Sequence, residues 1–206
     1  MGRAFSDIAF TPAVRAMQAR MGSRAHYAPL DDDTDRRDTL TSDEIDFIEA
    51  RDGFYQASVS ETGWPYVQFR GGPVGFLKAL DPRRLGYADY RGNQQYISTG
   101  NLQADNRVSI FLIDQARRRR LKLLGRVRIT DASDDPALTA RLTPPGYRAR
   151  IERTVVITIE AFDWNCPQHI TPRFTDAEIE TRLAPLHAEI ERLKQVLAQT
   201  GSKPPF

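Results

Sequence analysis

Arginine and amide side chains accompany short apolar runs throughout residues 64–125. Arg70 and Arg91 end strand-like stretches, and four consecutive arginines occupy positions 117–120. A guanidinium fixed in one orientation offers paired donors to a phosphate group or a ring carbonyl. Neutral donors and acceptors in the same region are Gln68, Asn93, Ser98 and Asn101. This set of groups, beside apolar strand faces, predicts a site for a flat, partly apolar anion.

The arginine run 117–120 also has a plainer interpretation, as a solvated hairpin turn. It leads directly into residues 120–129, where hydrophobic and basic residues alternate, so one or two guanidiniums would be held at the end of a strand. Arginine supplies 25 of the 29 basic residues, yet the formal net charge is only +2. Because repeats of exposed aromatic and basic residues are also missing, we expect no nucleic-acid partner.

Familiar catalytic and metal-binding patterns are missing from the sequence. No GxGxxG, GxxxxGK[ST] or GxSxG motif occurs. Cys166 and His169 are three residues apart, but two ligands without a second pair do not predict zinc. The acidic loop 31–38 lacks the glycine and the terminal glutamate of a calcium loop. We therefore expect no metal site, and we expect Cys166 to be a buried structural thiol.

Length and composition indicate one domain with appendages. The 206 residues are 40% hydrophobic and 27% charged, as in ordinary globular proteins. Strand-like segments do not alternate with long helices, which favours a mainly β fold with flanking helices, a small antiparallel barrel of six or seven strands. We expect the barrel in residues 54–174, a helical extension packed on it in 1–53, and an amphipathic helix and tail in 175–206.

Strands and helices are expected where periodicity and end signals agree. The expected strands are 54–60, 65–70, 76–80, 84–89, 107–114, 120–129 and 154–162. The expected helices are 12–20, a helix from Thr41 or Ser42 that Gly53 ends, and 134–142. The segment 107–114 is apolar on both faces, which predicts a central strand covered on both sides. Residues 92–105 are ambiguous between helix and loop.

Six aliphatic residues recur at heptad spacing near the C-terminus: Ile179, Leu183, Leu186, Ile190, Leu193 and Leu197. The repeat lasts close to three heptads, just short of a decisive coiled-coil pattern. Thr175 or Asp176 would cap this helix, with Glu178 in its first turn. The helix either packs on its own barrel or pairs with a partner helix in a dimer, and the sequence leaves both open.

Residues 54–125 resemble the pyridoxamine 5′-phosphate oxidase-like family of FMN-binding split β-barrels. The similarity lies in the order of the segments ASVSETGWPYVQ, FLKALDPRRLGYADY, NLQADNRVSIFL and RRLKLLG. Members of that family are homodimers whose FMN lies in clefts between the subunits, with the phosphate held by basic and hydroxyl side chains. The resemblance implies a split barrel, FMN as the cofactor, and a homodimer with the cofactor at the subunit interface.

The resemblance also implies a set of residues that contact FMN. Gln68 or Arg70 takes the place of a flavin-contacting arginine, and Lys78 matches a lysine that ends an apolar strand. Residues 91–98 would contact the phosphate, and the pair 119–120 would meet the flavin. The expected cofactor-binding residues are therefore Gln68, Arg70, Lys78, Arg91, Asn93, Ser98, Asn101, Arg119 and Arg120.

Departures from the family pattern bear on the substrate. Residues 71–73 are inserted after the second strand, and residues 92–95 replace a Ser-Arg-Lys phosphate cluster. The family enzyme's Trp-Arg and Arg-x-His substrate signature is missing, which implies an uncharacterised subgroup rather than the vitamin B6 enzyme itself. A polar-aromatic cluster after the last strand would border the substrate or form a structural turn: Trp164, Gln168, His169 and Arg173.

The sequence predicts an FMN-dependent oxidoreductase that passes electrons or hydride between flavin and a small molecule or a nicotinamide donor. No side chain is singled out as catalytic. The alternative is a non-catalytic flavin- or haem-binding or sensing module of the same fold. A single cysteine, the absence of a signal-peptide pattern and the lack of an apolar run of ~18 residues predict a cytoplasmic protein without a membrane partner.

Overall fold

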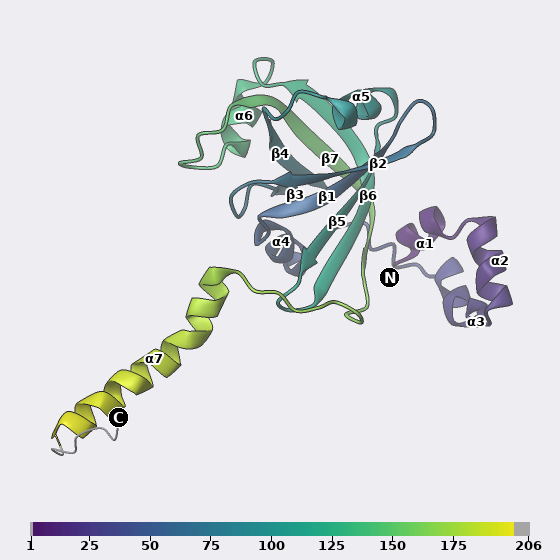
Figure 1. The fold of residues 1–206 in the computed structure, drawn as a ribbon. Coiled ribbons are helices and arrows are strands. Elements are labelled where there is room, and N and C mark those ends of the chain that lie inside the picture. The colour runs from purple at the N-terminus through teal and green to yellow at the C-terminus, as the bar shows by residue number, and fades with distance from the viewer. Residues whose placement is uncertain (1, 200–206) are drawn as a thin grey trace. The chain divides into compact units, whose positions relative to one another are not determined.

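The computed structural model describes residues 2–199, which form two compact units. The first unit contains residues 2–114 and 119–167, and the second contains 115–118 and 168–199. The helices and strands labelled in Figure 1 are α1 (Arg3–Ala9), α2 (Pro12–Arg20), α3 (Arg24–Tyr27), η1 (Ala28–Asp31), α4 (Ser42–Glu49), β1 (Gly53–Val59), β2 (Pro65–Gly71), β3 (Lys78–Asp81), β4 (Arg84–Tyr90), α5 (Ile97–Ala104), β5 (Arg107–Asp114), β6 (Arg119–Asp131), α6 (Pro136–Leu142), β7 (Ile151–Trp164) and α7 (Asp176–Gln199).

Seven antiparallel strands of the first unit form one sheet, in the order β2-β1-β5-β6-β7-β4-β3. The sheet curls on itself (Figure 1). Tyr87 of β4 therefore reaches β1 across the interior, and its hydroxyl donates to Gln56 Oε1 at 2.7 Å. Phe54 of β1 packs edge-on against Tyr87, with ring centroids 5.4 Å apart. The expected mainly β fold, a split antiparallel barrel with helices before and after it, is confirmed.

Local capping signals place the starts of α2 and α4 where the sequence predicts them. At the start of α2, Thr11 Oγ1 accepts from the backbone N–H of Val14 at 3.4 Å. At the start of α4, Glu44 Oε2 accepts from the backbone N–H of Thr41 at 2.9 Å, as one half of a capping box. The prediction that Gly53 ends this helix is wrong, because α4 ends at Glu49 and Gly53 already begins β1.

The segment 92–105, ambiguous in the sequence, contains both a loop and a helix. Residues 91–96 form the loop, and α5 begins at Ile97. Gln94 and Tyr96 have φ values of 61° and 53°, in the left-handed region that side chains rarely adopt. α5 packs against β1, β2 and β6, so the strained loop is fixed at one end of the barrel.

The central position of β5 is confirmed, but its expected cover on both sides is wrong. Val108, Ile110 and Leu112 are buried in the barrel, whereas Phe111 on the opposite face is only half-buried. In β6 the predicted alternation is confirmed, with hydrophobic residues facing the interior and basic residues facing outward. One face of β5 is therefore left for contacts outside the barrel.

Because the Tyr87 hydroxyl is buried, we expect the protein to lose stability at alkaline pH. Its side chain is 2% exposed, and burial raises the pKa of its hydroxyl above the usual value of 10. Above pH 10 the unfolded chain releases this proton and the folded chain does not, so the free energy of unfolding falls by about 1.4 kcal/mol per pH unit. Tyr87→Phe is expected to remove the contribution of Tyr87 to this slope and, since Gln56 Oε1 loses its donor, to cost about 1 kcal/mol at neutral pH.

Urea unfolding at neutral and alkaline pH measures this effect. The exposed Tyr55 is the matched control, and Tyr55→Phe should keep the wild-type slope. An alkaline slope that survives unchanged in Tyr87→Phe would contradict the assignment of this proton to Tyr87.

The second unit contains α7, whose N-terminus is capped as predicted. Thr175 Oγ1 accepts from the backbone N–H of Glu178 at 3.3 Å, and Glu178 Oε2 accepts from the backbone N–H of Thr175 at 2.9 Å. Within the described part of α7 no residue is buried, and Pro185 lies inside the helix. By their contacts, residues 168–174, expected in the barrel segment, belong to the unit that contains α7.

Two other predictions, on Cys166 and on membrane-spanning helices, can be compared with the structure. Cys166 is exposed, so the prediction of a buried thiol is wrong. Among residues 2–199, no helix combines the length and the apolar character that crossing a bilayer requires. The expected cytoplasmic location stays a prediction.

Candidate functional site

A small cavity of about 60 Å³ lies where β2, β4, β7 and α5 meet, and we refer to it as the α5 pocket. Its lining includes four residues that the sequence predicts as cofactor ligands: Gln68, Arg70, Asn93 and Ser98. Arg91 lies in the chain between two further lining residues, Tyr90 and Gly92. The folded chain therefore brings together groups that come from two segments about 30 positions apart in the sequence.

The N-terminus of α5 forms one wall of the α5 pocket. Its N-cap residue, Tyr96, makes no side-chain hydrogen bond to the helix, so the first N–H groups of α5 have no side-chain cap. Ser98, in the first turn, is 1% exposed and donates its Oγ hydrogen to Gln68 Oε1 at 2.7 Å. Left-handed residues such as Gln94 and Tyr96 cost about 1–3 kcal/mol each and recur at ligand sites. An uncapped helix N-terminus of this kind suits an anion.

A buried carboxylate, Asp89, organises the arginines behind the pocket. It is 3% exposed, and its two oxygens accept from Arg70 Nη1 at 2.7 Å and from Arg153 Nε at 2.9 Å. Burial opposes the charge of Arg153, but the hydrogen bond and charge of Asp89 outweigh it and raise the pKa of the guanidinium. The two hydrogen bonds to Asp89 thus hold both guanidiniums in fixed orientations.

Asp89 and Arg153 are not predicted as site residues by the sequence. Both residues also line the α5 pocket. They are cross-strand partners in the β4–β7 ladder, and Asp89 lies 64 positions before Arg153. In the sequence, each is simply a charged residue near one end of an apolar strand. Their pairing can be recognised only when the register between β4 and β7 is known.

The charges around the α5 pocket leave a positive excess. Three arginines, Arg70, Arg91 and Arg153, face two carboxylates, Asp89 and Glu152, so the cluster carries 3 − 2 = +1. Arg70 Nε is buried and has no hydrogen-bond partner among residues 2–199. Spare positive charge and a spare buried donor, beside an uncapped helix N-terminus, fit the phosphate group of a ligand.

Two predicted cofactor residues lie elsewhere in the barrel. Lys78 Nζ donates to the carbonyl of Arg141 at 3.0 Å, at the end of α6. Asn101 Nδ2 donates to Ser58 Oγ at 3.2 Å, which attaches α5 to β1. Neither residue lines the α5 pocket. In the described chain both make structural contacts.

Arg119 and Arg120 lie at the opposite end of β7 from the α5 pocket. The guanidinium carbon of Arg119 is 4.3 Å from the ring centroid of Trp164, the last residue of β7. Arg120 Nη2 donates to the carbonyl of Cys166 at 3.0 Å. Because Arg153 is near the start of β7, the two groups are about 36 Å apart along the strand.

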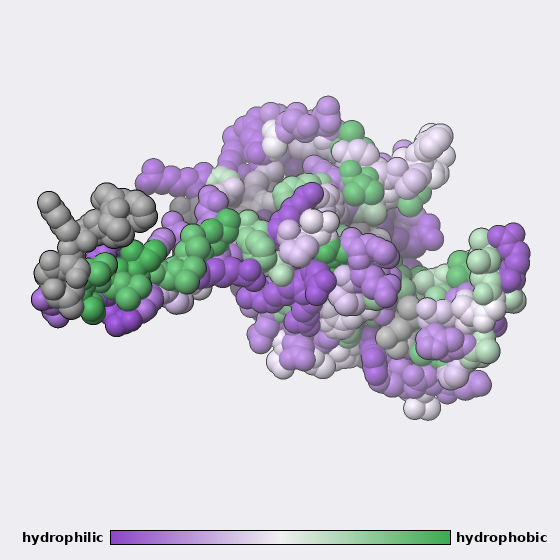
Figure 2. Space-filling view, turned by 60° about the horizontal axis from the view of Figure 1, so that its bottom comes forward, coloured by the Kyte–Doolittle hydropathy of each residue, from purple (hydrophilic) through white to green (hydrophobic). Residues whose placement is uncertain are grey.

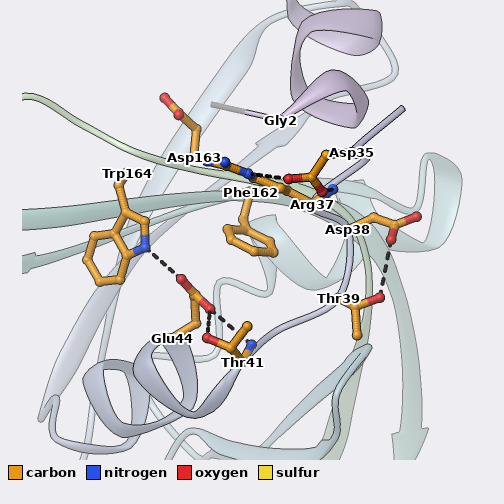
Figure 3. A pocket seen from close by; sticks show the side chains of 10 residues that line it. All are labelled: Gly2, Asp35, Arg37, Asp38, Thr39, Thr41, Glu44, Phe162, Asp163 and Trp164. Atoms are coloured by element: carbon orange, nitrogen blue, oxygen red, sulfur yellow. Dashed lines mark hydrogen bonds and ion pairs between the residues drawn. The ribbon is translucent and has the colours of Figure 1, made fainter. Parts of the chain in front are cut away.

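Trp164 also borders a larger cavity of about 410 Å³ (Figure 3), which we refer to as the Trp164 cavity. Its carboxylates already have partners: Glu44 Oε1 accepts from Trp164 Nε1 at 2.7 Å, and Asp35 pairs with Arg37 at 2.8 Å. The other two carboxylates of the lining, Asp38 and Asp163, pair with Arg36 at 3.3 Å and with Lys122 at 3.5 Å. The polar groups that Figure 3 shows on its walls are thus largely satisfied by one another, unlike those of the α5 pocket.

We expect the hydrogen bonds of Glu44, on the wall of the Trp164 cavity, to make a measurable contribution to stability. Burial raises the pKa of its carboxyl, but hydrogen bonds from Thr41 and Trp164 outweigh this and lower it below the usual value. Its contribution is therefore present above the unfolded pKa and is lost as pH falls through the folded pKa. Glu44→Ala removes the capping box and the acceptor of the indole N–H, so the free energy of unfolding should fall by about 1–3 kcal/mol.

The matched control for Glu44 is the exposed Asp43, which carries the same charge in the same helical turn. Asp43→Ala should change stability by less than about 0.5 kcal/mol. Urea unfolding at neutral pH compares the two variants, and equal losses would rule out the role given to Glu44.

The remaining candidates lie in the second unit. Gln168, His169 and Arg173 are all exposed, and His169 has a φ of 61°. The structure thus divides the predicted substrate-side cluster, because Trp164 belongs to the first unit. Their role at a substrate stays a prediction.

The sequence model of the family described as Pyridoxamine 5′-phosphate oxidase matches residues 42–164, more than half of the chain. No curated protein matches the sequence.

Several solved structures are similar at low identity. HupZ of Group A Streptococcus is 14% identical, with 66% of this chain and 100% of that chain covered and a TM-score of 0.47. A Clostridium acetobutylicum protein of the pyridoxinephosphate oxidase family, related to general stress protein 26, is 14% identical, with coverage of 66% and 94% and a TM-score of 0.44. An FMN-binding protein of Syntrophomonas wolfei is 9% identical, with coverage of 72% and 97% and a TM-score of 0.45.

Proposed function

Because this chain belongs to the pyridoxamine 5′-phosphate oxidase family, we propose that it is a flavoprotein that holds the phosphate of FMN in the α5 pocket. The observation that carries the proposal is the convergence of Gln68, Arg70, Asn93 and Ser98 on one cavity at a helix N-terminus. All four are hydrogen-bonding side chains that the family resemblance assigns to cofactor contacts.

In this proposal, residues on each wall of the α5 pocket would contact the phosphate or orient the groups that do. Arg70 offers its spare Nε donor to the phosphate, and the first backbone N–H groups of α5 add neutral donors. Asp89 keeps Arg70 and Arg153 oriented, and the positive excess of the cluster favours a dianion over a neutral ligand. The altered segment 92–95 still contributes Asn93 to the pocket, although the family's Ser-Arg-Lys cluster is missing.

We also propose that two copies of the chain complete the cofactor site. The outer faces of β1 and β2 expose a cluster of large apolar side chains: Tyr55 is 45% exposed, Val67 60% and Phe69 58%. The rings of Tyr55 and Phe69 lie 5.4 Å apart, so the cluster is continuous. Apolar clusters of this kind mark protein interfaces. In such a dimer Arg119 and Arg120 of one copy would reach the flavin held by the other, as the family resemblance implies.

FMN would supply hydride or electron transfer, and the protein would bind and orient it. We propose an oxidoreductase that uses a small molecule or a nicotinamide donor. A non-catalytic flavin- or haem-binding module is the alternative that the same fold allows.

The absorption spectrum of the purified protein tests the proposal. We expect the visible bands of flavin, or their appearance with a shift when FMN is titrated into colourless protein. Protein that remains colourless and does not bind added FMN would overturn the proposal. If flavin is bound, bleaching by a nicotinamide donor without oxygen supports the oxidoreductase, whereas flavin that no donor reduces supports the non-catalytic module.

A further inference from the structure

The apolar face of α7 lies outside the region that defines the family. The family match ends at residue 164, and α7 covers Asp176–Gln199. We refer to the six heptad residues as the α7 seam: Ile179, Leu183, Leu186, Ile190, Leu193 and Leu197. From Ile179 to Leu193 its side chains are 38–59% exposed, and Figure 2 shows a hydrophobic band along this helix. Large apolar side chains gathered on one helix face indicate a packing surface.

We propose that α7 pairs with α7 of a second copy of this chain as a parallel, two-stranded coiled coil. The spacing of 4, 3, 4, 3 and 4 residues assigns Leu183, Ile190 and Leu197 to the a positions of a heptad. Ile179, Leu186 and Leu193 take the d positions. All six seam positions are therefore aliphatic, as knobs-into-holes packing requires.

The charges that flank the α7 seam favour a parallel pair. Glu189 takes a g position and Lys194 the e position five residues later, so a parallel pair places Glu189 of each copy beside Lys194 of the other. An antiparallel pair with the seam fully overlapped would instead bring the two Glu189 side chains together. The present partners of these residues, Arg192 and Glu191, are exposed neighbours in the same helix, and such pairs hold weakly.

Pro185 gives a second reason for a partner. A proline inside a helix removes one backbone hydrogen bond, and a single helix without tertiary packing is marginal even without this loss. Pro185 takes a c position, on the side away from the α7 seam, so it leaves the packing surface intact. Burial of the seam against a second copy would offset its cost. Dimerisation of the barrels would raise the local concentration of α7, but the inference does not depend on flavin binding.

Cysteine cross-linking in the full-length chain tests the proposal. Cys166 is the only cysteine, so Cys166→Ser gives a thiol-free background. In that background Leu193→Cys places one thiol at a d position, where the two side chains of a parallel pair meet within disulfide reach. We expect mild oxidation to convert most of the chain from 23.3 kDa to a disulfide-linked species of twice that mass.

The matched control is Gln195→Cys, an f position on the outer side of the same helix, which should yield little dimer. Leu186→Asp added to Leu193→Cys should abolish the cross-link, because a charge in the seam disrupts pairing. Circular dichroism establishes that each variant is folded. Equal cross-linking at positions 193 and 195 would overturn the proposal. So would no cross-link at 193, whether α7 packs on its own barrel or pairs in the antiparallel direction.

Discussion

Replacing Asp89 by alanine is expected to lower the free energy of unfolding by about 3 kcal/mol. The carboxylate is 3% exposed and lies between two arginines whose side chains are themselves only 17% and 15% exposed. Removing one member of a buried ion pair costs about 3–5 kcal/mol, because the remaining charge stays buried without compensation. We choose the lower end since both arginines retain some contact with water. Urea unfolding of the variant and the wild type measures the difference.

A cross-strand ion pair on the surface of the same barrel serves as the control. Glu160 of β7 accepts from Arg126 of β6 at 2.6 Å, and the two side chains are 39% and 51% exposed. Glu160→Ala should cost no more than about 1 kcal/mol, because water screens exposed pairs. If Asp89→Ala lowers the free energy of unfolding as little as Glu160→Ala does, burial does not make the ion pairs of Asp89 more stabilising than an exposed pair.

Replacing Arg70 by alanine is expected to weaken FMN binding about 10- to 100-fold. A hydrogen bond to a charged group contributes about 1.5–3 kcal/mol, which corresponds to this range in the dissociation constant. Asp89 keeps Arg153 as a partner in this variant, so the barrel should remain folded. Arg70→Lys keeps the charge but loses the planar donor pair, and we expect an intermediate affinity. Fluorescence titration of the apoprotein with FMN gives the affinities.

Riboflavin, which lacks the phosphate, separates this prediction from a general loss of structure. Wild type and Arg70→Ala should bind riboflavin with similar affinity if Arg70 contacts only the phosphate. A variant that loses riboflavin as strongly as FMN would place Arg70 at the ring, or outside the site. Arg126→Ala removes a surface arginine of β6 and should leave both affinities unchanged.

Contacts close in sequence were the most predictable part of the structure. The caps that pair Thr41 with Glu44 and Thr175 with Glu178 join residues three positions apart, so local residue types suffice to indicate them. The alternation in β6 was equally clear, because a strand with one face in the core repeats every two residues. The end of α4 was misplaced, because glycine is only one of several ways in which a helix can end.

Prediction of the candidate site was less complete. Donor types and family resemblance identified Gln68, Arg70, Asn93 and Ser98, which meet in the α5 pocket. They did not identify Asp89, whose partners lie 19 and 64 positions away. A pairing over such distances depends on the register of β4 and β7 and on the curl that brings β2 over them.

By itself, the sequence determined the class of fold, the positions of most strands and helix starts, and the types of hydrogen-bonding group that a ligand could meet. Each of these follows from periodicity, from capping residues or from an inventory of donors, which are local properties of the chain. Only the tertiary structure decided which arginines share one pocket, that Lys78 and Asn101 lie outside it, and that the outer face of β5 is partly exposed. The physical reason is that closing the barrel sets distances between residues that are far apart in the chain, and these distances determine the charge and the hydrogen-bonding capacity left for a ligand.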